Sequence, residues 1–139
     1  MQYTISEVAK KFNVNISTLR YYDKEGLIPQ LEKSESGNRI FDDEAISGLI
    51  TIECLKRSGM SIKDIKTFID WCQTGDESLE DRLEMFLGRR EALQSQIKEL
   101  ESTLNYIEYK VDYYTKAVAD GTERIVKETV SNPRLLEMQ

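Results

Sequence analysis

The sequence predicts a mainly α-helical fold: a compact N-terminal domain of short helices with a small β-hairpin, followed by one long helix that pairs as a coiled coil. Three observations predict it. Two short capped helices joined by a tight turn open the chain, turn residues between extended flanks follow near residue 37, and apolar residues recur in heptads between residues 79 and 118. We therefore expect a domain at residues 1–75, a dimerising helix at 76–119 and a short tail at 120–139.

The first two helices have clear start and stop signals. Thr4 and Glu7 form a capping-box pattern before apolar residues at helical spacing. Asn15 is a good N-cap for the second helix, which Gly26 and Pro29 end. Two helices joined in this way form a helix-turn-helix, whose second helix is expected in a DNA major groove. Its outer face carries side chains that suit phosphates and base edges: Ser17, Thr18, Arg20, Tyr21 and Lys24.

The next segment predicts a small hairpin and then two more helices. Residues 31–41 contain the turn residues Ser-Gly-Asn between extended flanks, which is typical of a hairpin. Asp42 and Ser61 are N-caps for a third helix at residues 43–58 and a fourth helix at residues 62–73.

Three stretches of this N-terminal part carry a family resemblance. They are YTISEVAKKFNVNISTLRYYDKEGLIP, GNRIFDDEAI and LKRSGMSIKDI, and they cover about the first 75 residues. They resemble the MerR family of bacterial transcription regulators. The resemblance implies a winged helix-turn-helix in which the hairpin is the first wing and the third and fourth helices are the second. Phe41 stands where the family usually has tyrosine, and we expect it to pack beneath the hairpin.

The resemblance also implies how the protein would meet DNA. Base edges would be read from the second helix by Ser17, Thr18, Arg20 and Lys24. Phosphates would be contacted mainly by Tyr21, Tyr22 and Arg39, and by the fourth helix's N-terminus at Ser61 and Lys63. A homodimer would bind a pseudo-palindromic operator in double-stranded promoter DNA, then bend and untwist it so that RNA polymerase engages the promoter. Activation and repression both remain open.

The third helix carries a second apolar stripe, Ile46, Ile50 and Cys54, which the small domain cannot obviously cover. A partner subunit is the expected cover. Cys54 lies in a run that resembles MerR-type regulators responding to aldehydes and other electrophiles, so it is a candidate sensor thiol. The alternative, a small packed hydrophobe, also remains open. For Cys72 the helical spacing of its neighbours predicts a core position.

The long helix is predicted from twelve heptad positions, of which eleven are apolar and one is Arg90. The apolar seam reads Leu79, Leu83, Phe86, Leu93, Ile97, Leu100, Leu104, Ile107, Val111, Tyr114 and Val118. Such a helix is not stable alone, so we expect an obligate homodimer. An antiparallel pair is favoured, because a parallel one would stack Arg90 on its own copy.

Outside the seam, Tyr106, Tyr109 and Tyr113 form a further stripe. It would either decorate a solvent-facing helix or pack on the partner's third helix or the returning tail, and both interpretations remain open. Residues 120–139 are expected to form a short helix or to fray.

Composition bounds the function. The net charge is −6: residues 1–75 carry 10 Lys and Arg against 11 Asp and Glu, and residues 76–139 carry 9 against 14, so charge alone does not suggest DNA. The chain has no histidine, and no cysteine follows Cys72. We therefore expect no enzyme, no metal site and no cofactor. No long apolar run is present, which predicts a protein off the membrane and inside the cell. The resemblance to the MerR family implies the bacterial cytoplasm and association with the nucleoid.

Two other classes compete with a regulator. A coiled-coil adaptor would use its N-terminal domain to bind protein and would have no operator. An enzyme with Cys54 as nucleophile lacks an acid–base partner in the sequence.

Overall fold

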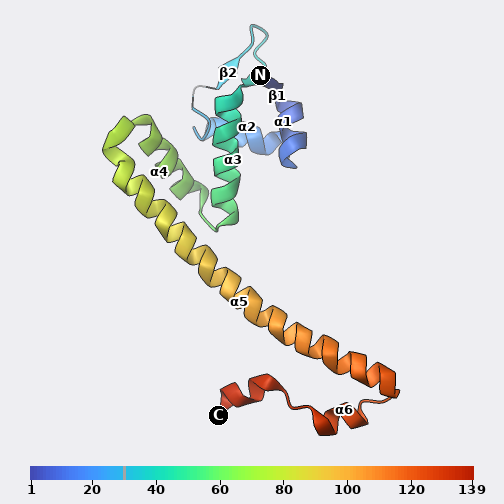
Figure 1. The fold of residues 1–139 in the computed structure, drawn as a ribbon. Helices are drawn as coiled ribbons and strands as arrows, with labels where there is room; N and C mark the ends of the chain where they lie inside the picture. The colour runs from blue at the N-terminus through green and yellow to red at the C-terminus, as the bar shows by residue number, and fades with distance from the viewer. Residues whose placement is uncertain (30) are drawn as a thin grey trace. The chain divides into compact units, whose positions relative to one another are not determined.

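The structure, a computed structural model, describes residues 1–29 and 31–139. It contains two compact units, an N-terminal unit (Met1–Ala92) and a C-terminal unit (Leu93–Gln139). The predicted fold class is confirmed: the chain is mainly helical, with a small antiparallel sheet and one long helix (Figure 1). The domain limits drawn from the sequence pattern stay predictions.

The N-terminal unit begins with the expected helix pair. Its first elements are β1 (Tyr3–Thr4), α1 (Ile5–Phe12) and α2 (Ile16–Lys24). The capping box is present, because Thr4 Oγ1 accepts from the Glu7 N–H at 3.2 Å while the Glu7 carboxylate accepts from the Thr4 N–H at 3.3 Å. Asn15 precedes α2 in an extended conformation, although its side chain makes no capping hydrogen bond.

The hairpin is also confirmed. β2 (Glu32–Lys33) pairs antiparallel with β3 (Arg39–Phe41), and Phe41 is fully buried, as expected. On its other side β3 pairs with β1, which places Tyr3 opposite Phe41. The sequence interpretation missed β1, since a two-residue strand carries no alternation to detect.

Helices α3 (Asp43–Arg57) and α4 (Ile62–Gln73) complete the core. The buried core side chains come from both helix pairs, from the segment after α2 and from β3: Val8, Ala9, Leu19, Tyr22, Leu27, Ile28, Phe41, Leu49, Ile52, Leu55, Ile65, Phe68 and Ile69. Cys72 is not among them. Cys72 is exposed, so the predicted core position is wrong. The apolar face of α4 ends with Ile69, and Cys72 lies one turn beyond, at the edge of a cleft.

The C-terminal unit is built on α5 (Leu79–Asp120), which begins in the N-terminal unit after a 3₁₀ turn, Gly75–Ser78. A short helix, α6 (Arg124–Thr129), and a final 3₁₀ segment, Pro133–Met138, follow.

The tail returns along α5. Val126 is buried against Tyr113 and Ala117, with Tyr109 and Val130 beside them. Further along, Asn132 donates to the Tyr106 hydroxyl at 2.9 Å, and Arg134 donates to the Ser102 carbonyl at 2.8 Å. Of the interpretations left open for the tyrosine stripe, packing against the returning tail is therefore the one observed.

Candidate nucleic-acid interface

Helix α2 divides into a buried face and an outward face. Leu19 and Tyr22 are each 1% exposed and fix the helix to the core. The outward face carries the exposed side chains Ser17, Arg20, Tyr21 and Lys24, with Thr18 half-buried between them. Three to four residues separate the members of one helical face, so these polar groups are presented together on one side.

Tyr22 requires a correction, because its side chain does not lie outward. The hydroxyl donates to Glu53 Oε1 at 3.0 Å and accepts from Lys56 Nζ at 2.6 Å. Burial raises the pKa of Tyr22, and the hydrogen bond to Tyr22 raises the pKa of Lys56. A phosphate contact from Tyr22 does not fit this burial; instead the residue joins α2 to α3. Nothing in the local sequence could have shown the pairing, since the partners lie more than thirty residues away.

Arg39 lies on β3, and its side chain reaches back to α2. Its Nε donates to Asp23 Oδ2 at 2.7 Å, and both side chains are mostly buried, at 24% and 20% exposure. Such a charge-assisted bond fixes the guanidinium and the end of α2 relative to each other. The hairpin and the helix therefore present their charged groups as one surface. Asp23 is a positioning residue that the sequence interpretation did not identify.

The start of α4 meets the end of α2. Ser61 Oγ accepts from the Asp64 N–H at 3.1 Å and caps α4, and Lys63 is exposed in the first turn. A depression of ≈ 390 Å³ joins the two helices, and Tyr21, Lys63 and Lys66 line it. The structure therefore brings Tyr21 and Lys63 together. Lys66, which also bonds Asp70, was missed, although its spacing of three residues from Lys63 on one helix could have revealed it.

The apolar stripe of α3 is left open in part. Ile50 is 58% exposed and Cys54 is exposed, whereas Ile46 packs against the core. Cys54 lies directly after Glu53 and two residues before Lys56, the two residues that bind Tyr22. Cys54 is thus close in sequence to the contact that joins α2 to α3.

The seam of α5 is uncovered along its whole length. All eleven apolar seam positions are exposed, from 38% at Leu93 to 80% at Val118. Contiguous exposed apolar surface of this extent is typical of an interface.

Two further features are absent from residues 1–29 and 31–139. No helix there has the length and apolar character needed to cross a membrane. In the same described residues, no group of three or more Cys, Asp or Glu side chains is placed to hold a metal ion.

Comparison with known proteins gives a consistent result. The MerR HTH family regulatory protein model matches residues 3–70, and a second model, described as MerR, DNA binding, matches residues 47–108. An uncharacterized HTH-type transcriptional regulator from Haemophilus influenzae is 42% identical over 126 residues, which are 91% of this chain and 93% of that protein.

Solved structures that resemble this chain also belong to MerR family regulators. The chain is similar to HiNmlR, a MerR family regulator lacking the sensor domain and bound to promoter DNA, with 42% identity, a TM-score of 0.84 and coverage of 91% and 96% of the two chains. A MerR family transcriptional regulator from Bacillus thuringiensis is 43% identical, with a TM-score of 0.72 and coverage of 81% and 98%.

Proposed function

Because this chain belongs to the MerR family of helix-turn-helix DNA-binding transcription regulators, we propose that it acts as a homodimer on a pseudo-palindromic operator in promoter DNA. The observation that carries the proposal is the division of α2, which buries Leu19 and Tyr22 and presents a polar outer face. The family is a class of regulators and not of enzymes, and we assign no catalytic residue.

Each contact has a proposed role. Arg20 and Lys24, with Ser17 and Thr18, face the base edges, since polar and charged side chains on a recognition helix read the major groove. Arg39, Tyr21, Ser61 and Lys63 contact phosphates, and Lys66 joins them because it lines the same depression as Tyr21 and Lys63. Phosphate contacts position the protein, and base contacts select the sequence.

The dimer forms through the α5 seam, with the two helices antiparallel. The exposure of all eleven apolar seam residues supports this proposal. A single helix of 42 residues that exposes such a seam to water is not stable. A spin label at the exposed Glu80 tests the direction. In an antiparallel pair the two labels lie more than about 40 Å apart at the ideal helical rise, and a short distance would mean a parallel pair.

On DNA, the dimer distorts the operator so that RNA polymerase can engage the promoter. Specificity then comes partly from deformation energy and partly from base contacts. Selection of bound duplexes from a random pool, followed by footprinting, tests the proposal. We expect one protected pseudo-palindrome within a promoter spacer. If no sequence is enriched over the starting pool, the protein is not an operator-binding regulator, and the coiled-coil adaptor gains support.

We also propose Cys54 as the trigger. It is exposed on the α3 stripe, and an adduct there adds volume where the partner subunit packs. Overpacking typically costs about 1 to 3 kcal/mol, enough to shift a two-state equilibrium about tenfold. The neighbouring Glu53 and Lys56 hold Tyr22, so a displacement of this part of α3 also reaches the recognition helix.

The two exposed cysteines supply a matched experiment. Cys54→Ser should bind the operator normally but no longer raise transcription in vitro when an aldehyde or quinone is added, whereas Cys72→Ser should remain inducible. Mass spectrometry of the thiols accompanies the assay. A Cys54→Ser protein that still responds would mean that Cys54 only packs.

A further inference from the structure

A cleft of ≈ 410 Å³ opens in the N-terminal unit, apart from the residues proposed to contact DNA. It lies between the first turns of α3, the last turns of α4 and the segment that follows α2. Small-molecule sites commonly measure about 300 to 1,000 Å³. The cleft therefore has the size of a ligand site.

Its inner wall is apolar. Leu27, Ile28, Phe68 and Ile69, all core residues with at most 8% exposure, line it together with Ala45. The described residues leave the small exposed edges of these side chains open to the cleft. An apolar body in the cleft would remove these edges from water, which is favourable in proportion to the area covered.

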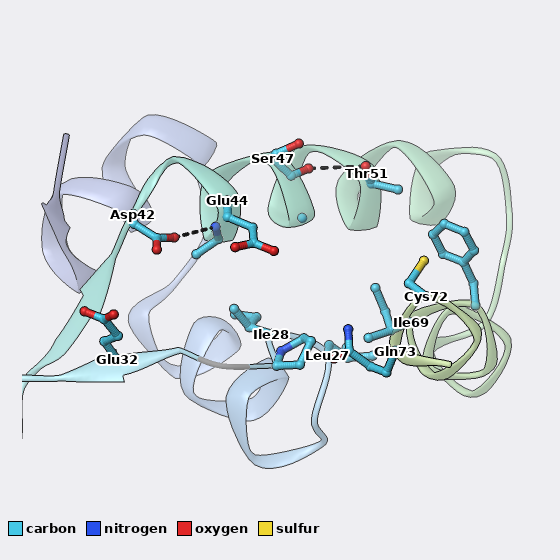
Figure 2. A pocket seen from close by; sticks show the side chains of 14 residues that line it. Leu27, Ile28, Glu32, Asp42, Glu44, Ser47, Thr51, Ile69, Cys72 and Gln73 are labelled. Atoms are coloured by element: carbon cyan, nitrogen blue, oxygen red, sulfur yellow. Dashed lines mark hydrogen bonds between the residues drawn. The ribbon is translucent and has the colours of Figure 1, made fainter. Parts of the chain in front are cut away.

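The mouth of the cleft is acidic. Glu32, Asp42 and Glu44 line it, and no Lys or Arg does so among the lining residues that the structure describes. Asp42 is already engaged, because its carboxylate accepts from the Ala45 N–H at 2.8 Å to cap α3. Figure 2 shows the Glu44 carboxylate extending from α3 over the cleft, with Glu32 on the neighbouring strand. Both side chains are exposed, and a cleft lined by charges of one sign raises the local concentration of ions of the opposite charge.

From this combination we infer that the cleft binds an organic cation with an apolar body, of the class of protonated aryl-alkyl amines. The apolar part covers Ile28, Phe68 and Ile69, and the ammonium group lies near Glu44 and Glu32. Anions of the same shape are repelled by the same carboxylates. The inference does not depend on the proposed regulatory function, since binding is measured on the protein without DNA.

Two residues of the lining make the site easy to test. Gly48 lies on the α3 side, and a Cβ built on it meets no atom within 4 Å, so a larger side chain there enters open space. Cys72 contributes a thiol that points into the same space from α4 (Figure 2). Cys54 is also exposed but does not line the cleft, so it is an internal reference for thiol reactivity.

The experiment compares three probes of one length: phenylbutylammonium, phenylbutanol and phenylbutyrate. Calorimetric titration of the full-length protein should give a dissociation constant about tenfold lower for the ammonium than for the alcohol, with no binding of the carboxylate. The ammonium should also slow alkylation of Cys72 by iodoacetamide and leave the rate at Cys54 unchanged.

Variants locate the site. Glu44→Gln should bring the affinity for the ammonium closer to that for the alcohol, and Glu32→Gln added to it should make the two equal. Asp43→Asn, in the same helical turn as Glu44 but outside the cleft lining, should change nothing. Gly48→Leu fills the cleft and should abolish binding of both probes, while Gly48→Ala should retain it.

Three results would overturn the inference. The first is equal affinity for ammonium and alcohol in the unaltered protein. The second is protection of both thiols at the same probe concentration, which would indicate binding elsewhere. The third is a Cys72 thiol that is already unreactive without any probe, which would mean that a second copy of the chain covers the cleft.

Discussion

The two units of this molecule bury very different amounts of apolar surface. Among the described residues, the N-terminal unit contains thirteen buried hydrophobic residues from five helices and strands and the segment after α2, whereas the C-terminal unit buries Tyr113, Ala117 and Val126. The C-terminal unit also carries most of the exposed seam, from Leu93 to Val118. The N-terminal unit therefore has a substantial core of its own, while the C-terminal unit has a small one, and in the proposed dimer a second copy would cover its exposed seam.

The largest expected effect comes from breaking the seam. Leu100 is exposed on the seam, so Leu100→Asp places a carboxylate from each subunit at the proposed dimer contact, where an unpaired buried charge is strongly unfavourable. We expect monomers by sedimentation and loss of operator protection. Unfolding of the N-terminal unit should be nearly unchanged when it is followed by the fluorescence of the single tryptophan, Trp71 on α4.

Ser95→Asp is the matched control, because it adds the same charge to an exposed position of α5 outside the seam. It should remain dimeric. A Leu100→Asp protein that is still dimeric at micromolar concentration would mean that the seam does not hold the subunits together.

The next effect separates the cores of the two units. Ile52 is fully buried in the N-terminal unit, so Ile52→Ala should lower its free energy of unfolding by about 2 to 5 kcal/mol. Val126→Ala removes two methyl groups from a small cluster, so it should lower the free energy of unfolding by about 1.5 kcal/mol. This loss should affect only the C-terminal unit. Hydrogen exchange resolved along the chain measures both. If Val126→Ala accelerated exchange in α1 and α2 as well, the two units would not be independent.

A smaller effect concerns DNA, which we place on the N-terminal unit alone. Arg20→Ala should cost about 1 to 3 kcal/mol of operator binding and relax sequence preference. Arg39→Ala should weaken binding to operator and random duplex alike and reduce the salt dependence, as expected for a phosphate contact. Arg124→Ala, on α6 of the C-terminal unit, is the control. Titrations at several salt concentrations distinguish these outcomes, and unchanged affinity in both Arg20→Ala and Arg39→Ala would refute the assignment.

The sequence predicted the helices and the hairpin that local signals specify. Caps and glycines bounded α1 and α2, turn residues marked the hairpin, and the heptads marked α5, because each signal lies within a few residues of the structure it specifies. Contacts between distant segments were not predictable in this way. The pairing of β1 with β3 and the binding of Tyr22 by Glu53 and Lys56 join residues that are far apart in the chain.

Cys72 shows a different limit. Its helical spacing correctly placed it on the side of α4 that carries Ile65, Phe68 and Ile69, but periodicity does not indicate where the neighbouring element stops. The last turn of α4 extends past the packed part of the core and borders the cleft, so the same face is buried at Ile69 and open at Cys72.

The smallest effect tests the contact between α2 and α3 within the N-terminal unit, and its pH-dependent part should appear only at high pH. Burial raises the pKa of Tyr22 above its ordinary value of 10.0, and the hydrogen bond to Tyr22 raises the pKa of Lys56 above 10.5. Folding therefore favours the protonated form of both groups. Their contribution to stability is fully present below these ordinary values and is lost as the pH rises through the raised pKa values.

Tyr22→Phe keeps the buried ring but removes one titrating group and the partner of Lys56, so it should flatten the fall of stability above about pH 10. At neutral pH it should cost about 1 kcal/mol, the usual value for one hydrogen bond. Denaturant titrations followed by Trp71 fluorescence give the free energy of unfolding at each pH. Tyr21→Phe is the control, because Tyr21 is 46% exposed and forms no part of this network, so its curve should parallel that of the unaltered protein. If Tyr22→Phe also paralleled it, the hydroxyl would not link α2 to α3 in solution, and the proposed route from Cys54 to the recognition helix would lose its physical connection.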